Sequence, residues 1–122
     1  DVFETLGRES VVLVTDAMAA AGVPDGDYVL GPAAVTVADG VARLRDGGAI
    51  AGGTAHLIDV VRTTWHGGVD LVDAVFAASR QGAGILGDES VGALAPGLRA
   101  DLVVVDEELR PVMVVRRGEV VA

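Results

Sequence analysis

Residues 11–18 read VVLVTDAM, an apolar run that ends at an aspartate, Asp16, and leads into small residues. An unbroken run of branched apolar residues is typical of a strand buried on both faces, as in a parallel sheet. An aspartate that closes such a strand lies at the carboxyl end of the sheet, where ligands and catalytic groups gather in α/β folds. Asp16 could equally cap the following turn, because aspartate accepts backbone N–H bonds well. The spacing alone leaves both roles open.

The composition is globular and acidic. Of the 122 residues, 51% are hydrophobic but only 3% aromatic, and the net charge at pH 7 is −9. Small and branched aliphatic residues of this kind fill the cores of α/β folds. Because the negative charge would repel phosphate backbones and anionic lipids, we expect neither nucleic acid nor a membrane as a partner. The absence of cysteine excludes disulfides and thiolate metal sites and fits a cytoplasmic location.

A glycine-rich stretch, GGAIAGGT, occupies residues 47–54. Glycine lets the backbone approach a ligand closely, and free N–H groups at the start of a following helix can bind an anion or a sugar. We expect Thr54 to be the N-cap of a helix that runs through Leu57, Val60, Val61 and Thr64. The alternative is a flexible connection without a ligand, which the stretch taken alone favours. Neither a Walker lysine nor GxGxxG spacing supports a nucleotide loop.

The remaining pattern predicts short strands and two helices. We expect strands over 27–30, 33–37, 41–44 and 100–106, a closing hairpin over 111–121, and helices over 57–65 and 71–80. Asp39-Gly40 predicts a primed hairpin turn, and Gly82, Gly84 and Gly87 are expected to break the second helix. The strands are too few for independent sheets, and the chain opens without a methionine. We therefore expect it to be part of a larger fold.

Three motifs carry a family resemblance. Residues 13–18, LVTDAM, followed by Ala21-Gly22, resemble the LVTDAxxxAG signature of N-acetylglucosamine-6-phosphate deacetylases. Residues 50–54, IAGGT, resemble the L-[AS]-G-S-[ST] loop of the same family. Residues 92–103, GALAPGLRADLV, resemble the G-x-[IL]-x-x-G-x-x-A-[DN]-L segment common to many amidohydrolases. The resemblance runs in order over residues 8–122.

The resemblance implies an α/β fold, the C-terminal part of a (β/α)₈ metal-dependent hydrolase barrel with strands of a small composite β-sandwich. Residues 11–16 would be the eighth barrel strand, and most of a barrel of about 250 residues would lie upstream. Four segments are expected: the last barrel strand and its loop at 1–26, inserted sandwich strands at 27–46, a barrel-packing loop and helices at 47–99, and sandwich strands at 100–122.

The resemblance also implies the reaction, hydrolysis of the acetamide of N-acetylglucosamine 6-phosphate to glucosamine 6-phosphate and acetate in amino-sugar catabolism. A divalent metal ion, zinc or similar, would polarise the carbonyl and activate its bound water. Asp16 matches the catalytic aspartate and would carry the proton from that water to the leaving amine. Ile50, Ala51 and Gly52 match the loop that contacts the sugar. We expect the full-length enzyme to be a homodimer and this chain alone to be inactive.

The chain departs from the family at several positions. The barrel's metal-binding glutamate and histidines have no counterpart, and His56 and His66 are expected at the surface or at helix ends, so no residue here is assigned to the metal. His56 stands where the family has a small polar residue, and Gly53 replaces the usual serine. Residues 80–83, RQGA, stand where an Asn-Pro-Ala pattern is common, a change we expect to be structural.

Two alternatives stay open. The first is an amidohydrolase that acts on another amide, which only the substrate-recognising residues upstream would discriminate. The second is a non-catalytic interaction module. It predicts that the isolated chain folds cooperatively and stays soluble, whereas part of a barrel would expose large apolar patches and associate.

Overall fold

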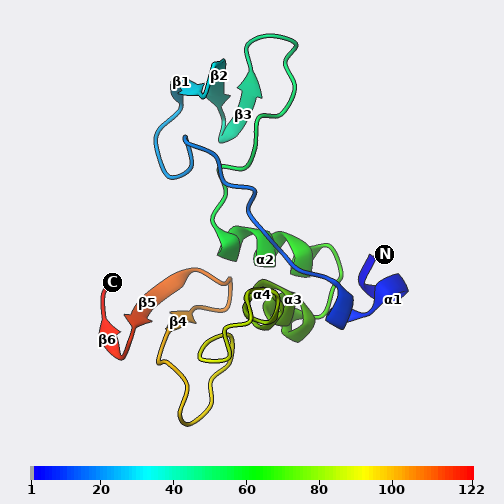
Figure 1. Cartoon of the computed structure of the whole chain (residues 1–122), viewed down its shortest axis with the longest axis vertical. Coiled ribbons are helices and arrows are strands. Elements are labelled where there is room, and N and C mark those ends of the chain that lie inside the picture. Colours follow the sequence, from blue (N-terminus) through cyan, green and yellow to red (C-terminus); the bar gives the residue numbers. More distant parts are fainter. Residues whose placement is uncertain (1) are drawn as a thin grey trace. The chain divides into compact units, whose positions relative to one another are not determined.

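The computed structural model describes residues 2–122 (Figure 1). Asp1, the first residue of the expected 1–26 segment, lies outside the described residues. The chain divides into two compact units, one formed by Val14–Val60 and the other by residues 2–13 together with Val61–Ala122. Within residues 2–122, no helix has the length and hydrophobicity needed to cross a membrane.

The first unit contains a three-stranded antiparallel sheet. Its strands β1 (Gly26–Leu30), β2 (Ala33–Ala38) and β3 (Val41–Leu44) follow one another in the order of the chain, which confirms the three strands expected from the sequence. Alternate residues point to one face, where Val35, Val37 and Ala42 are buried together with Ala20. Met18, Tyr28, Leu30, Leu44 and Ala51 pack against these four residues.

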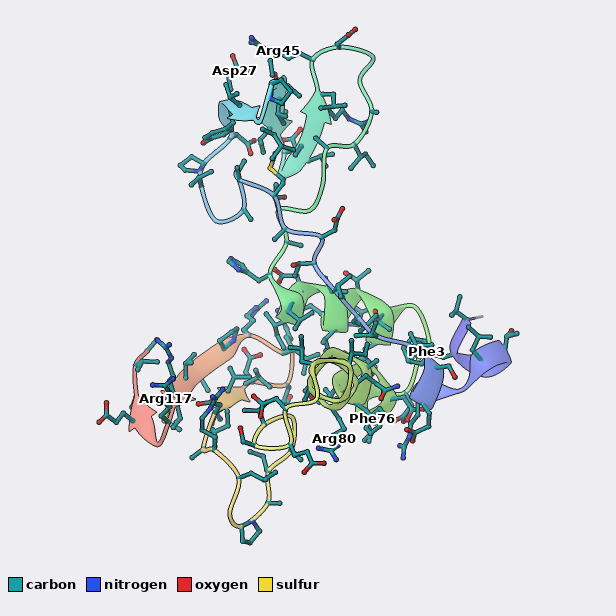
Figure 2. The ribbon with its side chains drawn as sticks, viewed as in Figure 1. Phe3, Asp27, Arg45, Phe76, Arg80 and Arg117 are labelled. Carbon is teal, nitrogen blue, oxygen red and sulfur yellow. The ribbon has the colours of Figure 1, made fainter. Side chains whose placement is uncertain are left out.

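The other face of this sheet carries a network of polar side chains beside the exposed Val29. Arg45 forms an ion pair with Asp27 at 2.5 Å and donates a second hydrogen bond to the hydroxyl of Thr36 at 3.2 Å (Figure 2). The Thr36 hydroxyl in turn donates to Asp27 at 2.7 Å. Because Asp27 and Thr36 face each other across β1 and β2, this network supports the observed strand register.

The turn between β2 and β3 has the predicted geometry. Asp39 and Gly40 have φ values of 52° and 70°, so both central residues are left-handed, as a type I′ turn requires. The carboxylate of Asp25 accepts hydrogen bonds from the backbone N–H groups of Asp39 at 2.6 Å and Gly40 at 3.2 Å. The turn is therefore fixed both by its own residue types and by a side chain from outside it.

The second unit contains most of the helices. It begins with α1 (Val2–Leu6) and the short 3₁₀ helix η1 (Arg8–Ser10). The boundary between the two units falls within α2 (Leu57–His66), after Val60. The second unit then continues with α3 (Leu71–Ala78) and α4 (Arg80–Leu86). Asp70 caps α3, since its carboxylate accepts the N–H of Val72 at 2.9 Å. Arg8 binds Asp73 at 3.1 Å and lies 4.8 Å above the ring of Phe76.

The predicted end of the second helix is wrong. The expected helix over 71–80 stops at Ala78, and α4 starts at Arg80 and continues through Gly82 and Gly84. Each internal glycine costs about 1 kcal/mol relative to alanine, so packing must favour this helix over local propensity. Ala83, between the two glycines, is buried. Gly87 ends the helix as expected, in the left-handed conformation with φ 67°.

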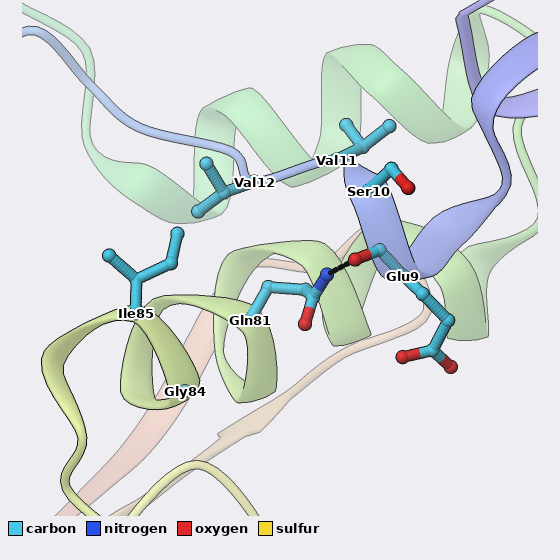
Figure 3. A pocket seen from close by; sticks show the side chains of 7 residues that line it. All are labelled: Glu9, Ser10, Val11, Val12, Gln81, Gly84 and Ile85. Carbon is cyan, nitrogen blue, oxygen red and sulfur yellow. Dashed lines mark hydrogen bonds between the residues drawn. The ribbon is translucent and has the colours of Figure 1, made fainter.

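Gln81, within residues 80–83, contacts the start of the chain. Its side-chain amide donates a hydrogen bond to the backbone carbonyl of Arg8 at 3.3 Å. It donates a second one to the backbone carbonyl of Glu9, which Figure 3 shows. These bonds tie α4 to η1 beside a hollow of about 240 Å³. That the change at residues 80–83 is structural stays a prediction.

The chain ends in a second antiparallel sheet of β4 (Leu102–Val105), β5 (Pro111–Arg116) and β6 (Glu119–Val120). The pairing of β4 with β5 shifts between Val104 and Val105. In the loop between these strands, Leu109 is buried with φ 58°, and Arg62 donates to its carbonyl and to that of Glu108, both at 2.8 Å. The expected closing hairpin is confirmed.

Residues 11–16 pair with no strand in the described part of the chain. Val11 has extended dihedral angles, φ −117° and ψ 131°, and the N–H of Leu13 donates to the carbonyl of Ala77 at 3.0 Å. Val12 and Val14 are exposed. A strand is defined by hydrogen bonds to its neighbours, so the assignment of this segment to a barrel stays a prediction.

Candidate active site

Asp16 ends the apolar run in an unusual backbone conformation. Its φ is 50°, in the left-handed region, and its side chain is exposed. This region costs most L-residues about 1–2 kcal/mol, although aspartate and asparagine tolerate it better. The next residues turn at once, because the N–H of Ala21 donates to the carbonyl of Met18 at 2.9 Å. The carboxylate therefore lies at a sharp bend with access to solvent.

Gly53 holds the backbone on both sides of this bend. Its N–H donates to the carbonyl of Asp16 at 2.7 Å, and its own carbonyl accepts the N–H of Met18 at 3.2 Å. The two bonds form a parallel bridge between Ala17 and Gly53. The structure thus brings together the TDA motif and the glycine-rich loop, two motifs that the sequence placed far apart.

The glycine-rich loop is also anchored to β3. Leu44 donates to the carbonyl of Ala49 at 2.8 Å, Ala51 donates to Ala42 at 2.9 Å, and an antiparallel bridge joins Arg43 to Ile50. These bonds argue against the alternative of a flexible connection, because a mobile linker would not make a regular set of backbone hydrogen bonds.

The three residues predicted to contact a sugar have different surroundings. The side chain of Ile50 is 67% exposed, whereas that of Ala51 is half-buried against the core of the first unit. Gly52 has φ 125°, and a Cβ built there would lie 3.0 Å from both the carbonyl oxygen of Asp16 and the Cβ of Met18. Asp16 and Gly52 are therefore neighbours. Ile50 and Ala51, which precede Gly52 in the loop, lie beside β3.

Thr54 is not the N-cap that the sequence predicted. Its hydroxyl donates to the carbonyl of Gly40 instead. Helix α2 begins at Leu57, and the carboxylate of Asp59 accepts the N–H of His56 at 3.1 Å. Thr54 lies too far before the helix to reach its free N–H groups, and its hydroxyl joins the loop to the β2–β3 turn.

Sequence reasoning missed the part that Gly53 plays. The adjacent glycine pair is the available signal: the sequence predicts a close approach of the loop backbone to a ligand, whereas in the structure Gly53 bonds to the backbone of Asp16 and Met18. The histidines do not add to the site. The His66 ring lies 4.9 Å from that of Trp65, and no group of three or more His, Asp or Glu side chains within residues 2–122 is arranged to hold a metal ion. The residues present do not form a metal site by themselves.

Residues 8–121 match the amidohydrolase family. The chain belongs to the amidohydrolase family. This amidohydrolase chain is 42% identical over 104 residues to an N-acetylgalactosamine-6-phosphate deacetylase of Escherichia coli O157:H7, covering 84% of this chain and 27% of that protein.

Two solved structures are similar over nearly the whole amidohydrolase chain. An N-acetylglucosamine-6-phosphate deacetylase from Thermotoga maritima is 38% identical with a TM-score of 0.87, over 98% of this chain and 33% of that one. A Mycobacterium smegmatis N-acetyl-D-glucosamine-6-phosphate deacetylase, an aspartate-to-alanine variant in complex with N-acetyl-D-glucosamine 6-phosphate, is 43% identical with a TM-score of 0.89, over 98% of this chain and 32% of that one. The chain thus spans about a third of either structure.

Proposed function

We propose that the full-length protein carrying this chain hydrolyses the acetamide of N-acetylglucosamine 6-phosphate, giving glucosamine 6-phosphate and acetate. The observation that carries the proposal is the position of Asp16, an exposed carboxylate at a left-handed bend that the glycine-rich loop holds through backbone hydrogen bonds. The names of the similar proteins support the substrate class, since all three are deacetylases of phosphorylated amino sugars.

In this proposal Asp16 moves the proton. Its carboxylate takes a proton from a water molecule as the water oxygen attacks the acetyl carbonyl carbon. The protonated carboxyl then gives that proton to the amide nitrogen, the C–N bond breaks, and the amine and acetate leave. The divalent metal ion that the family resemblance implies would need ligands from outside this chain. We therefore assign it to none of these residues and to none of these steps.

The loop residues Ile50, Ala51 and Gly52 are proposed to contact the sugar. Gly52 lies against the backbone of Asp16, so a sugar held along this loop would have its acetamide within reach of the carboxylate. The exposed side chain of Ile50 provides an apolar surface for the sugar ring.

A second candidate substrate is N-acetylgalactosamine 6-phosphate. It is favoured by the E. coli relative, which is named for that sugar and is 42% identical to this chain. The two sugars differ only in the configuration of one hydroxyl group, and the chemistry proposed for Asp16 is the same for both. A direct comparison of kcat/KM for the two sugars decides between them.

The test measures acetate release by the full-length protein, with a divalent metal supplied. In Asp16→Asn we expect kcat to fall by about 10²–10⁴-fold, the usual contribution of a general acid–base group. Asparagine tolerates a left-handed backbone as aspartate does, so the variant should fold. Asp46→Asn, an exposed aspartate outside the site, is the matched control. A wild-type protein that releases no acetate overturns the substrate, and equal activity in Asp16→Asn overturns the mechanism.

The remaining features of the proposal concern the whole protein. We propose a cytoplasmic homodimer with the small-molecule sugar as its partner, on the family resemblance. The net charge of −9 disfavours binding to nucleic acid and to anionic membranes. Light scattering on the full-length protein tests the dimer, and a monomeric mass would contradict it.

A further inference from the structure

Side chains from outside the β2–β3 turn bind Gly40 on both its N–H and its carbonyl. The carboxylate of Asp25 accepts this N–H at 3.2 Å, together with the N–H of Asp39 at 2.6 Å, and the hydroxyl of Thr54 donates to the Gly40 carbonyl. Asp25 directly precedes β1, whereas Thr54 is the last residue of the glycine-rich loop. The turn is therefore joined both to the chain before the sheet and to the loop after it.

The hydroxyl of Thr54 makes its bond where the backbone pairing of the loop with β3 ends. The N–H of Ala51 donates to the carbonyl of Ala42 at 2.9 Å, and within residues 2–122 no later backbone hydrogen bond joins the loop to β3 or its turn. The N–H of Gly53 donates to the carbonyl of Asp16 instead, at 2.7 Å. The segment that approaches Asp16 is thus fixed to the sheet by backbone at one end and by the hydroxyl of Thr54 at the other.

A single hydrogen bond of this kind can control how well the loop binds a ligand. The net contribution of one intramolecular hydrogen bond changes an equilibrium about 3–10-fold. A ligand that binds only the ordered loop has its apparent Kd raised in proportion as that ordered state is depopulated. Removing the hydroxyl should therefore weaken binding without changing any atom that contacts the ligand.

We propose that Thr54 is a positioning residue for the sugar. Its hydroxyl, bound to the turn that Asp25 holds, keeps residues 50–52 in the arrangement that contacts the sugar beside Asp16. Thr54 touches neither the sugar nor the reacting atoms in this role. The inference rests on the proposed function, because it assumes that residues 50–52 contact the sugar.

The test is the Kd of N-acetylglucosamine 6-phosphate, measured by calorimetry in the full-length protein with a divalent metal supplied. Asp16→Asn is the background, because it slows turnover and lets binding be measured directly. Thr54→Val has nearly the same shape without the hydroxyl and should raise Kd about 3–10-fold. Thr54→Ser keeps the hydroxyl and should change Kd by less than about 2-fold. With Asp16 intact, Thr54→Val should raise KM by a similar factor and leave kcat nearly unchanged.

The matched control is Thr63→Val. Thr63 is exposed on α2, and its hydroxyl makes no hydrogen bond in the part of the chain that the structure describes. This change should leave Kd and KM as they are. An unchanged Kd in Thr54→Val overturns the proposal, even if the variant is less stable, since Thr54 would then have only a structural role. An equal rise in Thr54→Ser overturns it as well, because the hydroxyl would not be the cause.

Asp25→Ala tests the same arrangement from the other side of the turn, and it replaces Thr54→Val if that variant does not fold. It removes both acceptors of the turn, so Kd should rise, and adding Thr54→Val should then have a smaller effect than it has alone, because both act through Gly40. Asp46→Ala is the control. An unchanged Kd in Asp25→Ala overturns the proposal.

Failure of the proposed function shows separately. A wild-type protein that does not bind the sugar overturns the proposed function and this inference together, whereas binding that Thr54→Val leaves unchanged overturns this inference alone. Full activity in Asp16→Asn overturns only the proton transfer, and KM in the wild-type background then tests Thr54.

Discussion

Asp101 accepts a hydrogen bond from the backbone N–H of Arg117 at 2.7 Å, which joins the residue before β4 to the turn between β5 and β6. Arg117 has φ 52°, so the carboxylate stabilises a turn that is otherwise strained. The Arg99 guanidinium binds the other oxygen of the same carboxylate at 2.5 Å. The N–H of Arg117 foremost, and then Arg99, lower the pKa of Asp101 below its ordinary value.

This geometry predicts a dependence of stability on acid. An aspartate has a pKa of about 3.9 in the unfolded chain, and Asp101 has a lower pKa in the fold, so the unfolded state binds more protons in this range. The contribution of Asp101 to the free energy of unfolding is therefore complete at neutral pH, and it is lost as the pH falls through the pKa that Asp101 has in the folded state. The pKa values of Asp88 and Asp106 are lowered as well. The main cause is the hydrogen bond from the Ser90 hydroxyl for Asp88 and the one from the Arg110 N–H for Asp106. These two carboxylates therefore also stabilise the fold more at neutral pH than in acid.

The measurement is the thermal midpoint of the full-length protein between pH 7 and pH 3. Asp101→Asn should lower the midpoint at pH 7 and differ less from the wild type at pH 3. Asp46→Asn serves as control, since no hydrogen bond of its side chain is seen in residues 2–122. A constant difference between Asp101→Asn and wild type across this range would contradict the prediction.

Gly92 and Gly97 provide a matched pair for packing in the second unit. Their φ values are 87° and 89°, so alanine at either position pays the same backbone cost of about 1 kcal/mol. At Gly92 the new Cβ would lie 2.8 Å from the Cβ of Ala83 and 3.2 Å from the Cα of Arg80, whereas at Gly97 nothing lies within 4 Å. We expect Gly92→Ala to cost about 1–3 kcal/mol more than Gly97→Ala, the typical cost of overpacking. Equal free energies of unfolding for the two variants, from urea denaturation, would argue against the contact.

The hydrogen bonds of Arg62 predict that a lysine at this position would stabilise the fold less than the arginine does. Arg62 binds the carbonyls of Glu108 and Leu109 through two separate nitrogens, at 2.8 Å each, and so holds the loop in which Leu109 has φ 58°. Lysine keeps the charge but cannot reproduce this fork. We expect Arg62→Lys to lower the free energy of unfolding by about 1–2 kcal/mol.

The control for this change is Arg80→Lys. Arg80 is exposed at the start of α4, and its side chain makes no hydrogen bond or ion pair within residues 2–122. The same replacement there should change the free energy of unfolding by less than about 0.5 kcal/mol. Losses of similar size at both positions would show that the Arg62 fork does not stabilise the loop.

Much of the secondary structure could be predicted because it follows from local signals. The alternation of residues 33–38 and the Asp39-Gly40 pair specify a hairpin through side-chain direction and turn angles, which neighbouring residues determine. Helix α4 could not be predicted in this way. Its two internal glycines disfavour a helix locally, and only the packing of the folded unit, with Ala83 buried, overrides that cost.

For the candidate site, the sequence by itself determined which residue types are present: an aspartate after an apolar run, a glycine-rich loop, and the motifs that indicate an amidohydrolase. Only the tertiary structure decided that the two motifs meet, that Asp16 is left-handed, and that Gly53 forms backbone hydrogen bonds with Asp16 and Met18. The physical reason is that steric exclusion and hydrogen bonds between distant segments depend on how closely two backbones approach, a distance that no local pattern of residues encodes.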